Sequence, residues 1–146
     1  MIEIVINNSK PIALKRHRVA KFGRMYDPSA KDKKKTVQEI KKFKPDVKLK
    51  GPILIEYKFC YERPKSHFRT GKFSNILKDN APKHHTNKAD LDNVIKYYND
   101  VLMVDFIEDD SQIVCIWAVK KYNSESQVVI KLSENVRKND WLEVAG

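Results

Sequence analysis

Apolar residues alternate with polar ones, or fill every position, in four stretches of the chain. These stretches are Ile2–Ile6, Pro52–Tyr61, Ser111–Lys121 and Gln127–Leu132, and each predicts a β-strand. Successive side chains of a strand point to opposite faces, so a stretch that is apolar throughout fits a strand covered on both faces. The third stretch has that pattern and predicts a central strand. The polar residues Asn123–Ser126 predict a hairpin turn between it and the last strand.

Two further stretches carry apolar residues at every third or fourth position, which is the helical spacing. In Leu91–Leu102 the apolar stripe is nearly continuous. In Ser29–Phe43 it is sparser, and we expect Ser29 to cap the start of the helix and Pro45 to stop it. The polar and basic segment Glu62–Lys88 predicts a long loop, a length that is usually functional or mobile.

These elements predict one domain over residues 1–146, of class α/β (α+β), with a mixed β-sheet packed against two main helices. The chain is 41% hydrophobic, which is too apolar for a disordered chain. No apolar run approaches the ~18 residues of a membrane span. The N-terminus lacks the basic and apolar blocks of a secretion signal, so we expect a cytoplasmic protein.

The remaining apolar residues of note predict only packing. Cys60 and Cys115 stand in strand-like stretches without the spacing of a metal site, which predicts free thiols. Near the C-terminus, Trp141 and Leu142 are expected to pack against the domain.

Charge is divided unevenly along the chain, whose formal net charge is +10. Residues 10–50 hold fifteen Lys and Arg against four acidic residues, whereas residues 85–110 hold two against seven. A strongly basic chain attracts polyanions, and nucleic acid fits better than a membrane because no basic helix with bulky apolar anchors is present. The residues expected to contact a DNA backbone are Lys15, Arg16, Arg18, Lys21, Arg24, Lys83 and Lys88.

Several aromatic residues and histidines near the basic segments could either contact DNA or have a structural role. Phe22, Phe68 and Phe73 stand among basic residues, where an aromatic side chain either inserts into opened DNA or packs under a loop. His84 and His85 precede the acidic region, where they either contact a phosphate or lie in an ordinary loop.

Carboxylates gather in the acidic region around a possible metal site. In a continuous helix Asp90 would lie roughly 200° around the axis from Asp92, so the two can share an ion only if Asp90 stands at or before the helix N-cap. Lys96 lies on the same flank of the helix as Asp92. Asp109 and Asp110 precede a predicted strand, which we expect to bring one of them beside the helix start. Such oxygen ligands favour Mg²⁺ or Mn²⁺ over zinc.

The same carboxylates also fit readings without catalysis. Asp92 and Lys96 can form a surface ion pair, Asp90 a plain helix cap, and Asp109 with Asp110 a turn. The chain would then be a non-catalytic basic DNA-binding or architectural protein. An Asp-x-Asp nucleotide-sugar site is a third reading, which leaves the basic charge unexplained.

Motifs follow one another in a fixed order along the chain. They are Asp90-Leu91-Asp92-Asn93-Val94-Ile95-Lys96, Asp100-Val101-Leu102, Asp109-Asp110-Ser111-Gln112-Ile113-Val114 and Lys120, preceded by Pro11-Ile12-Ala13-Leu14-Lys15-Arg16-His17-Arg18 and Tyr26-Asp27-Pro28. The series resembles the RusA family of Holliday junction resolvases, with its DxDNxxK helix, DDxQV strand entry and basic N-terminal loop. The chain departs from that family at Ala89, where many members have Pro, and at Val104-Asp105-Phe106, which lacks a frequent Gly.

The resemblance implies a mixed α/β fold and a homodimeric, Mg²⁺- or Mn²⁺-dependent endodeoxyribonuclease. Such an enzyme makes paired nicks in four-way DNA junctions during recombination and repair, in the cytoplasm of a bacterial or phage-infected cell, with no cofactor besides the metal. By position, Asp90, Asp92 and Asp110 match the family's essential carboxylates and Lys96 its essential lysine. Asp109 matches the other half of the acidic pair. Paired nicks in a nearly two-fold junction also call for two active sites.

Overall fold

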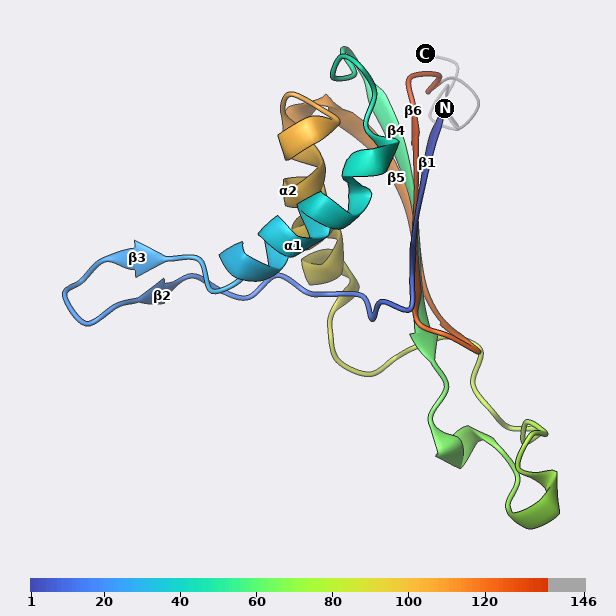
Figure 1. The fold of residues 1–146 in the computed structure, drawn as a ribbon. Coiled ribbons are helices and arrows are strands. Elements are labelled where there is room, and N and C mark those ends of the chain that lie inside the picture. Colours follow the sequence, from blue (N-terminus) through green and yellow to red (C-terminus); the bar gives the residue numbers. More distant parts are fainter. Residues whose placement is uncertain (137–146) are drawn as a thin grey trace, which may run out of the picture.

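A four-stranded β-sheet with two helices on one face forms the body of the protein in the computed structural model, which describes residues 1–136 (Figure 1). The strands are β1 (Ile2–Asn7), β4 (Ile53–Glu62), β5 (Ile113–Asn123) and β6 (Gln127–Ser133), and the helices are α1 (Ala30–Ile40) and α2 (Leu91–Asp105). The predicted α+β class, mixed sheet and two helices are confirmed. Trp141 and Leu142 lie outside the described residues.

The strands are ordered β1-β6-β4-β5, so β4 is central. β4 pairs antiparallel with β6 and parallel with β5. The parallel pair is possible because the connection from β4 to β5 crosses over through α2. The predicted hairpin between β5 and β6 is wrong, because the turn after β5 carries the chain past the end of β4. Two backbone amides at that end, Glu62 and Arg63, donate to Ser126 Oγ (3.1 Å) and the Asn123 carbonyl (3.1 Å).

β5 is an edge strand, although its apolar pattern predicts a central one. On its outer side it pairs only near its end, where the amide of His85 donates to the Lys120 carbonyl (3.2 Å) and the amide of Tyr122 to the Lys83 carbonyl (3.0 Å). Within residues 1–136, no other strand covers the outer side of residues 113–119. We call residues 113–119 the open edge.

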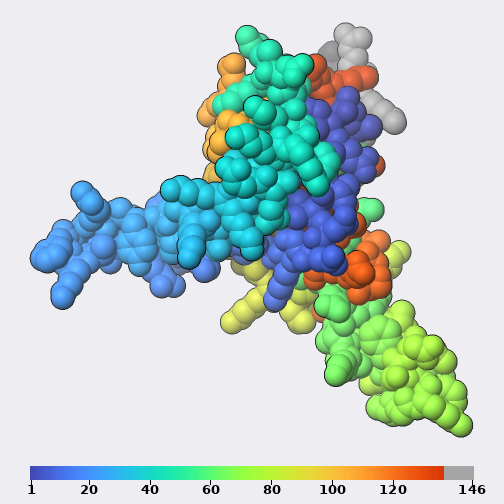
Figure 2. Space-filling view, viewed as in Figure 1, coloured from blue at the N-terminus to red at the C-terminus, as the bar shows by residue number. Residues whose placement is uncertain are grey.

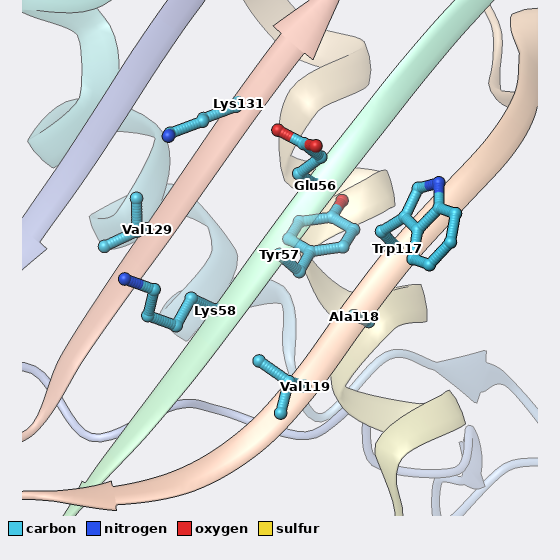
Figure 3. A pocket seen from close by; sticks show the side chains of 8 residues that line it. All are labelled: Glu56, Tyr57, Lys58, Trp117, Ala118, Val119, Val129 and Lys131. Carbon is cyan, nitrogen blue, oxygen red and sulfur yellow. The ribbon is translucent and has the colours of Figure 1, made fainter. Parts of the chain in front are cut away.

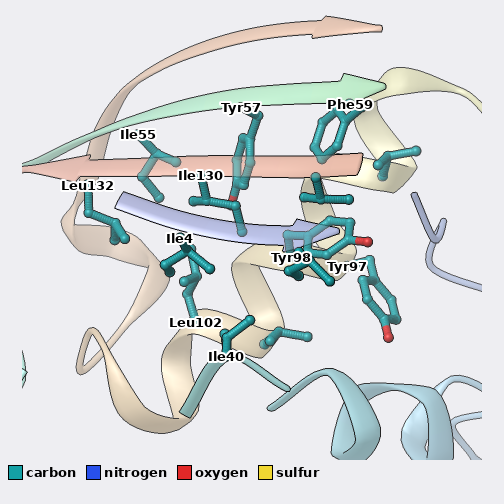
Figure 4. Packing of buried hydrophobic residues seen from close by; sticks show 14 of the residues in the cluster. Ile4, Ile40, Ile55, Tyr57, Phe59, Tyr97, Tyr98, Leu102, Ile130 and Leu132 are labelled. Carbon is teal, nitrogen blue, oxygen red and sulfur yellow. The ribbon is translucent and has the colours of Figure 1, made fainter. Parts of the chain in front are cut away.

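The core lies between the sheet and the two helices (Figure 4). Alternate residues of β4 point into it, as predicted, together with the apolar stripe of α2. The most buried members include Ile4, Ile40, Ile55, Tyr57, Phe59, Val94, Tyr98, Val101, Leu102, Ile130 and Leu132. Two pairs of polar groups in this core are hydrogen-bonded: Tyr57 Oη donates to Asn99 Oδ1 (2.6 Å), and the hydroxyls of Thr36 and Tyr97 lie 2.8 Å apart. Such pairing removes the penalty of burying an unsatisfied polar group. The buried hydroxyl of Tyr61 has no hydrogen-bond partner within residues 1–136.

Helix α1 begins after Ser29, as predicted, and a 3₁₀ turn (Lys41–Phe43) continues it until Pro45 follows. The buried Ser29 side chain does not cap the helix, however. Its Oγ accepts a hydrogen bond from the amide of Lys15 (3.0 Å), so Ser29 holds the N-terminal segment against α1.

Two segments project from the body (Figures 1 and 2). One is the basic hairpin, residues 15–26, in which β2 (Arg18–Val19) pairs with β3 (Met25–Tyr26). Gly23 takes a φ of +76° in its turn, a conformation that favours glycine. The other is the arm, residues 63–82, which contains short 3₁₀ turns at Lys65–His67 and Gly71–Phe73. The arm corresponds to most of the predicted long loop.

Two smaller expectations also bear on the fold. Both cysteines are free, as predicted, with Cys60 buried and Cys115 only partly covered. Among the helices of residues 1–136, none has the length and apolar character that crossing a membrane requires.

Candidate active site

Asp90 stands at the N-cap of α2, which is the position it needs if Asp90 and Asp92 are to bind one metal ion. Its backbone is extended (φ −67°, ψ 141°), and the helix begins at Leu91. The Asp90 carboxylate makes no capping hydrogen bond. Asp92 lies in the first turn, where the partial positive charge of the helix N-terminus stabilises an anion. Two exposed carboxylates, two residues apart in the sequence, thus mark the start of α2.

Lys96 follows one turn after Asp92, and both side chains are exposed. The non-catalytic interpretation predicts a surface ion pair between Asp92 and Lys96, and this pair is not formed. Among residues 1–136, the ion pairs are Lys33–Asp27, Lys33–Asp100 and Arg69–Asp79. The Lys96 ammonium and the Asp92 carboxylate are therefore both available to a ligand.

Lys120 fixes the segment that leads into Asp90. Its Nζ donates to the carbonyl of Asn87 (2.9 Å) and to the carbonyl of Ala89. Sequence reasoning places Lys120 in the motif series without a role. The one feature of the sequence that could have indicated a role for Lys120 is its position, as a lysine on the helix-facing side of a largely apolar strand.

Asp109 and Asp110 have different surroundings. Asp109 caps the 3₁₀ turn Asp110–Gln112, and its carboxylate accepts from the Ser111 amide (3.2 Å) and hydroxyl. These hydrogen bonds lower the pKa of Asp109. Gln112 completes the turn by accepting from the Asp109 amide (3.0 Å) and donating to the Leu49 carbonyl (2.9 Å). The Asp110 carboxylate, by contrast, is exposed and has no hydrogen-bond partner among the described residues.

The two acidic groups lie at opposite ends of α2 (Figure 1). A helix of 15 residues is roughly 22 Å long at about 1.5 Å per residue. β5 runs back along α2, so its start, which follows Asp110, lies at the C-terminal end of the helix. The expectation that the strand brings Asp110 beside the helix start is therefore wrong within one chain. Accordingly, residues 1–136 contain no group of three His, Cys, Asp or Glu side chains placed to hold a metal.

The basic hairpin is anchored beside the first turns of α2. The amide of Leu14 donates to the Asn93 carbonyl (2.9 Å), and the amide of Ile12 donates to Tyr98 Oη (3.2 Å). Lys15 and Arg16 follow directly along the chain. The predicted DNA-contacting residues are all exposed: Lys15, Arg16, Arg18, Lys21, Arg24, Lys83 and Lys88.

Lys33 ties the base of the hairpin to both helices, a role that sequence reasoning missed. Its Nζ donates to Asp27 Oδ2 (2.7 Å) and to Asp100 Oδ2 (2.9 Å). Burial opposes the lysine's charge, but the two carboxylates outweigh burial and raise the pKa of Lys33, while the hydrogen bond from Lys33 lowers the pKa of Asp27. Asp27, after the hairpin, is thereby joined to α1 and α2.

The three phenylalanines near the basic segments behave differently. Phe22 is 95% exposed at the tip of the hairpin, and Phe73 is 48% exposed on the arm. Phe68 is partly covered and bridges to Leu77 within the arm. Phe68 is thus less accessible than Phe22, which projects from the tip of the basic hairpin.

His85 packs in an aromatic cluster at the base of the arm. Its ring stacks on Tyr61, with centroids 3.7 Å apart, and tilts against Tyr122 at 5.1 Å. Burial, followed by the charge of Lys120, lowers the pKa of His85 below its usual 6.5. His84 is exposed beside it. The packing of His85 is that of a structural residue.

Acid is expected to destabilise the protein through His85. The folded protein disfavours the charged ring, so the unfolded chain binds the proton more readily. The contribution of His85 to stability is therefore complete above pH 6.5 and is lost as the pH falls below it. Thermal unfolding across this range should show a decrease in Tm that His85→Phe, which keeps the ring stacking, reduces. The exposed control His84→Phe should retain the full decrease; an equal reduction in both variants would contradict the assignment.

A shallow depression of about 420 Å³ lies on the opposite, helix-free face of the sheet (Figure 3). Trp117 and Val119 from β5 border it, together with Glu56 and Lys58 from β4 and Lys131 from β6. Its lining includes one carboxylate and none of the charged residues at the start of α2, so it does not match the candidate chemistry.

Comparison with known protein families finds a match over most of the chain. The family model described as Endodeoxyribonuclease RusA matches residues 8–133, which include the basic hairpin, α2 and both acidic groups. No curated protein matches the chain significantly. Because the model matches most of its length, the chain belongs to the RusA endodeoxyribonuclease family.

Proposed function

We propose that this protein is a divalent-metal-dependent endonuclease that resolves Holliday junctions by paired nicks, with each active site built by two copies of the chain. Membership of the family implies endodeoxyribonuclease activity on Holliday junctions. The observation that carries the proposal is the start of α2. There Asp90, Asp92 and Lys96 are exposed and form no ion pair within residues 1–136, and Asn93 anchors Leu14, which leads into the basic hairpin.

The residues fit a hard divalent cation. Asp90, Asp92 and Asp110 offer only oxygen donors, which suit Mg²⁺ or Mn²⁺. All three are exposed, and the first two lie at the start of α2, where Asn93 accepts a hydrogen bond from Leu14, just before the basic hairpin. Asp109 is engaged in capping its turn, so we assign it to orienting Asp110 rather than to direct binding. Without a cation, the carboxylates would repel the phosphates of bound DNA. This repulsion supports a divalent cation between the carboxylates and the phosphates.

The second copy is needed because one chain separates its acidic groups. Asp90 and Asp92 begin α2, while Asp110 follows its far end. A two-fold related copy that places its own Asp110 at the start of α2 completes the set. The same symmetry creates a second, equivalent site, as two nicks in a four-way junction require.

The chain's own residues have separate tasks in this mechanism. The hairpin residues, with Lys83 and Lys88, bind and orient the backbone. Lys120 holds the segment before Asp90 through the Ala89 carbonyl. Lys96 places its ammonium on the phosphate, where it stabilises the negative charge that develops on the departing oxygen. Bound at the carboxylates, a divalent cation supplies charge neutralisation at phosphorus and lowers the pKa of the attacking water.

Cleavage of a labelled four-way junction tests this function against that of a non-catalytic DNA-binding protein. The wild type should nick the junction in Mg²⁺, but not linear duplex, and EDTA should stop the reaction. Asp92→Asn should lower the rate at least ~10²-fold, because a ligand of the charge-stabilising cation is lost, while retaining junction binding. Asp46→Asn, an exposed aspartate far along the chain from α2, should cut normally.

Each opposite result has a clear meaning. A wild type that binds the junction in Mg²⁺ without cutting it would show an architectural protein. Normal cutting by Asp92→Asn would remove Asp92 from the site while leaving the activity established.

A further inference from the structure

The arm, residues 63–82, adds nothing to the protein core. None of its residues is buried, and residues 69–80 are all exposed. Ordering such a segment costs conformational entropy, and no burial of apolar side chains in the core offsets that cost. Long loops of this kind in a compact domain are usually functional.

The neck of the arm is nevertheless firmly held. Arg63 Nη1 donates to the Pro82 carbonyl (2.8 Å), which joins the outgoing chain to the returning one. The ring of His67 packs edge-on against Tyr122, with centroids 4.6 Å apart. Further out, the amide of Lys78 donates to the His67 carbonyl (2.9 Å). These contacts fix the direction in which the arm leaves the sheet.

Positive charge dominates the surface of the arm. Residues 63–82 hold five Lys and Arg against one acidic residue, Asp79. That carboxylate is already paired with Arg69 (3.5 Å). Lys65, Lys72 and Lys78 are exposed and form no ion pair within residues 1–136. The arm therefore carries free cations that suit a polyanion.

Apolar side chains are exposed among these cations at the tip of the arm. Phe73 is 48% exposed, Ile76 41% and Leu77 40%. The Lys72 ammonium lies over the Phe73 ring, 5.2 to 5.5 Å being the range of such contacts in this protein outside Lys120, and here 5.4 Å from its centroid. Grouped apolar side chains on a surface mark a binding site. Apolar side chains beside cations are the combination with which proteins enter the minor groove of DNA.

The arm starts at the same end of the sheet as the candidate site. It follows directly after β4, and the segment that returns from it to Asp90 runs along the end of β5. There the amide of Tyr122 donates to the Lys83 carbonyl (3.0 Å), and Lys120 Nζ donates to the Ala89 carbonyl. The basic hairpin is anchored to the start of α2 as well, but the hairpin and the arm project in different directions (Figure 1).

We propose that the arm binds a second duplex of branched DNA, different from the duplex bound by the basic hairpin, and thereby gives the protein a preference for junctions over linear DNA. This inference rests on the proposed function and assigns the arm a part in substrate recognition. The free lysines contact phosphates, and the apolar tip enters the minor groove. Two copies of the chain then offer two hairpins and two arms, one for each duplex of a four-way junction. A linear duplex meets only one of the two elements.

Other partners fit the arm less well. An acidic protein or an anionic membrane would also attract free lysines and an apolar tip. Neither accounts for the position of the arm, which leaves the sheet beside the candidate nuclease site. DNA that lies against the basic hairpin brings further phosphates to this end of the molecule when it is branched, so DNA satisfies both the composition and the position of the arm.

Binding titrations in EDTA, with a four-way junction and with a linear duplex of the same sequence, test the role of the arm. The wild type should bind the junction more tightly. Lys65→Gln, Lys72→Gln and Lys78→Gln together should lower junction affinity at least ~10-fold at moderate salt and leave duplex affinity unchanged. A wild type without preference for the junction would overturn the proposal. So would an arm variant that binds the junction normally or loses affinity equally for both DNAs.

The matched control removes the same charge elsewhere. The triple Gln variant of Lys41, Lys42 and Lys44, which are exposed at the end of α1, should bind each DNA nearly as the wild type does. An equal loss of junction affinity in this control would assign the effect to net charge and overturn the role of the arm. Thermal unfolding should be the same in both variants, because the arm contributes no residue to the core.

A second variant tests the tip without changing any charge. Phe73→Ser, Ile76→Ser and Leu77→Ser together should lower junction affinity roughly 10-fold, because apolar area buried in the groove is lost. Duplex affinity should be unchanged. The control Val47→Ser, which alters an exposed valine away from the arm, should bind both DNAs normally. A tip variant that binds the junction as tightly as the wild type would overturn the minor-groove contact.

These results are separable from those of the proposed function, because binding is measured without metal. A chain whose preference for junctions depends on the arm but that does not cut them keeps the role of the arm and loses the resolvase activity. A chain that cuts junctions while the arm variant binds them normally keeps the activity and loses the role of the arm.

Discussion

Asp90→Asn and Asp110→Asn, each inactive alone, should recover junction nicking when the two chains are mixed within one dimer. If every site takes Asp90 and Asp92 from one copy and Asp110 from the other, the mixed dimer places both substitutions in a single site. Its other site is then intact. With free exchange of subunits, about one quarter of all sites should be wild type, and the mixed dimer should make single rather than paired nicks.

The matched control is a mixture of Asp90→Asn with Asp92→Asn. Both substitutions then fall in the half-site contributed by α2, so each site of the mixed dimer carries one of them and no activity should return. The measurement compares nicked and resolved products of a labelled junction, after dimers carrying two different tags have been purified. Purified mixed dimers of Asp90→Asn and Asp110→Asn that remain inactive would contradict a shared site.

Neutralising three residues of the basic hairpin should weaken junction binding strongly. Arg18→Gln, Lys21→Gln and Arg24→Gln together remove three exposed cations from a segment that projects from the body. If each contacts a phosphate, the dependence of affinity on salt should become shallower. The magnitude of the slope of log affinity against log salt concentration should decrease by about 3, and affinity should drop roughly 10²-fold at moderate salt. Binding titrations of a junction at several salt concentrations, with EDTA present, measure both quantities.

The control changes net charge equally at another place. Lys41, Lys42 and Lys44 are exposed at the end of α1 away from the hairpin, and their replacement by Gln should affect affinity much less. An equal loss in both triple variants would mean that overall charge, rather than the hairpin, attracts the DNA.

The sequence alone determined the local elements and the chemistry of the candidate site. The 3.6-residue period of α2 and the two-residue period of β4 report which side chains are buried, because each period follows from backbone geometry over adjacent residues. The N-cap position of Asp90 follows from the same local reasoning. The type of ligand in the candidate metal site also follows from the sequence, because carboxylates supply oxygen ligands and a lysine supplies a positive charge wherever the fold places them.

Tertiary structure alone decided how distant segments meet. Strand order is set by the crossover through α2 and by the turn around the end of β4, neither of which leaves a periodic signal in β5 or β6. Spacing therefore predicted a hairpin that does not form. The separation of Asp110 from Asp90 has the same origin, because the direction in which β5 returns along α2 depends on packing over the whole sheet. The apolar pattern of β5 indicates that the strand is buried but does not indicate which segment covers it. Within residues 1–136, no strand covers the outer side of residues 113–119.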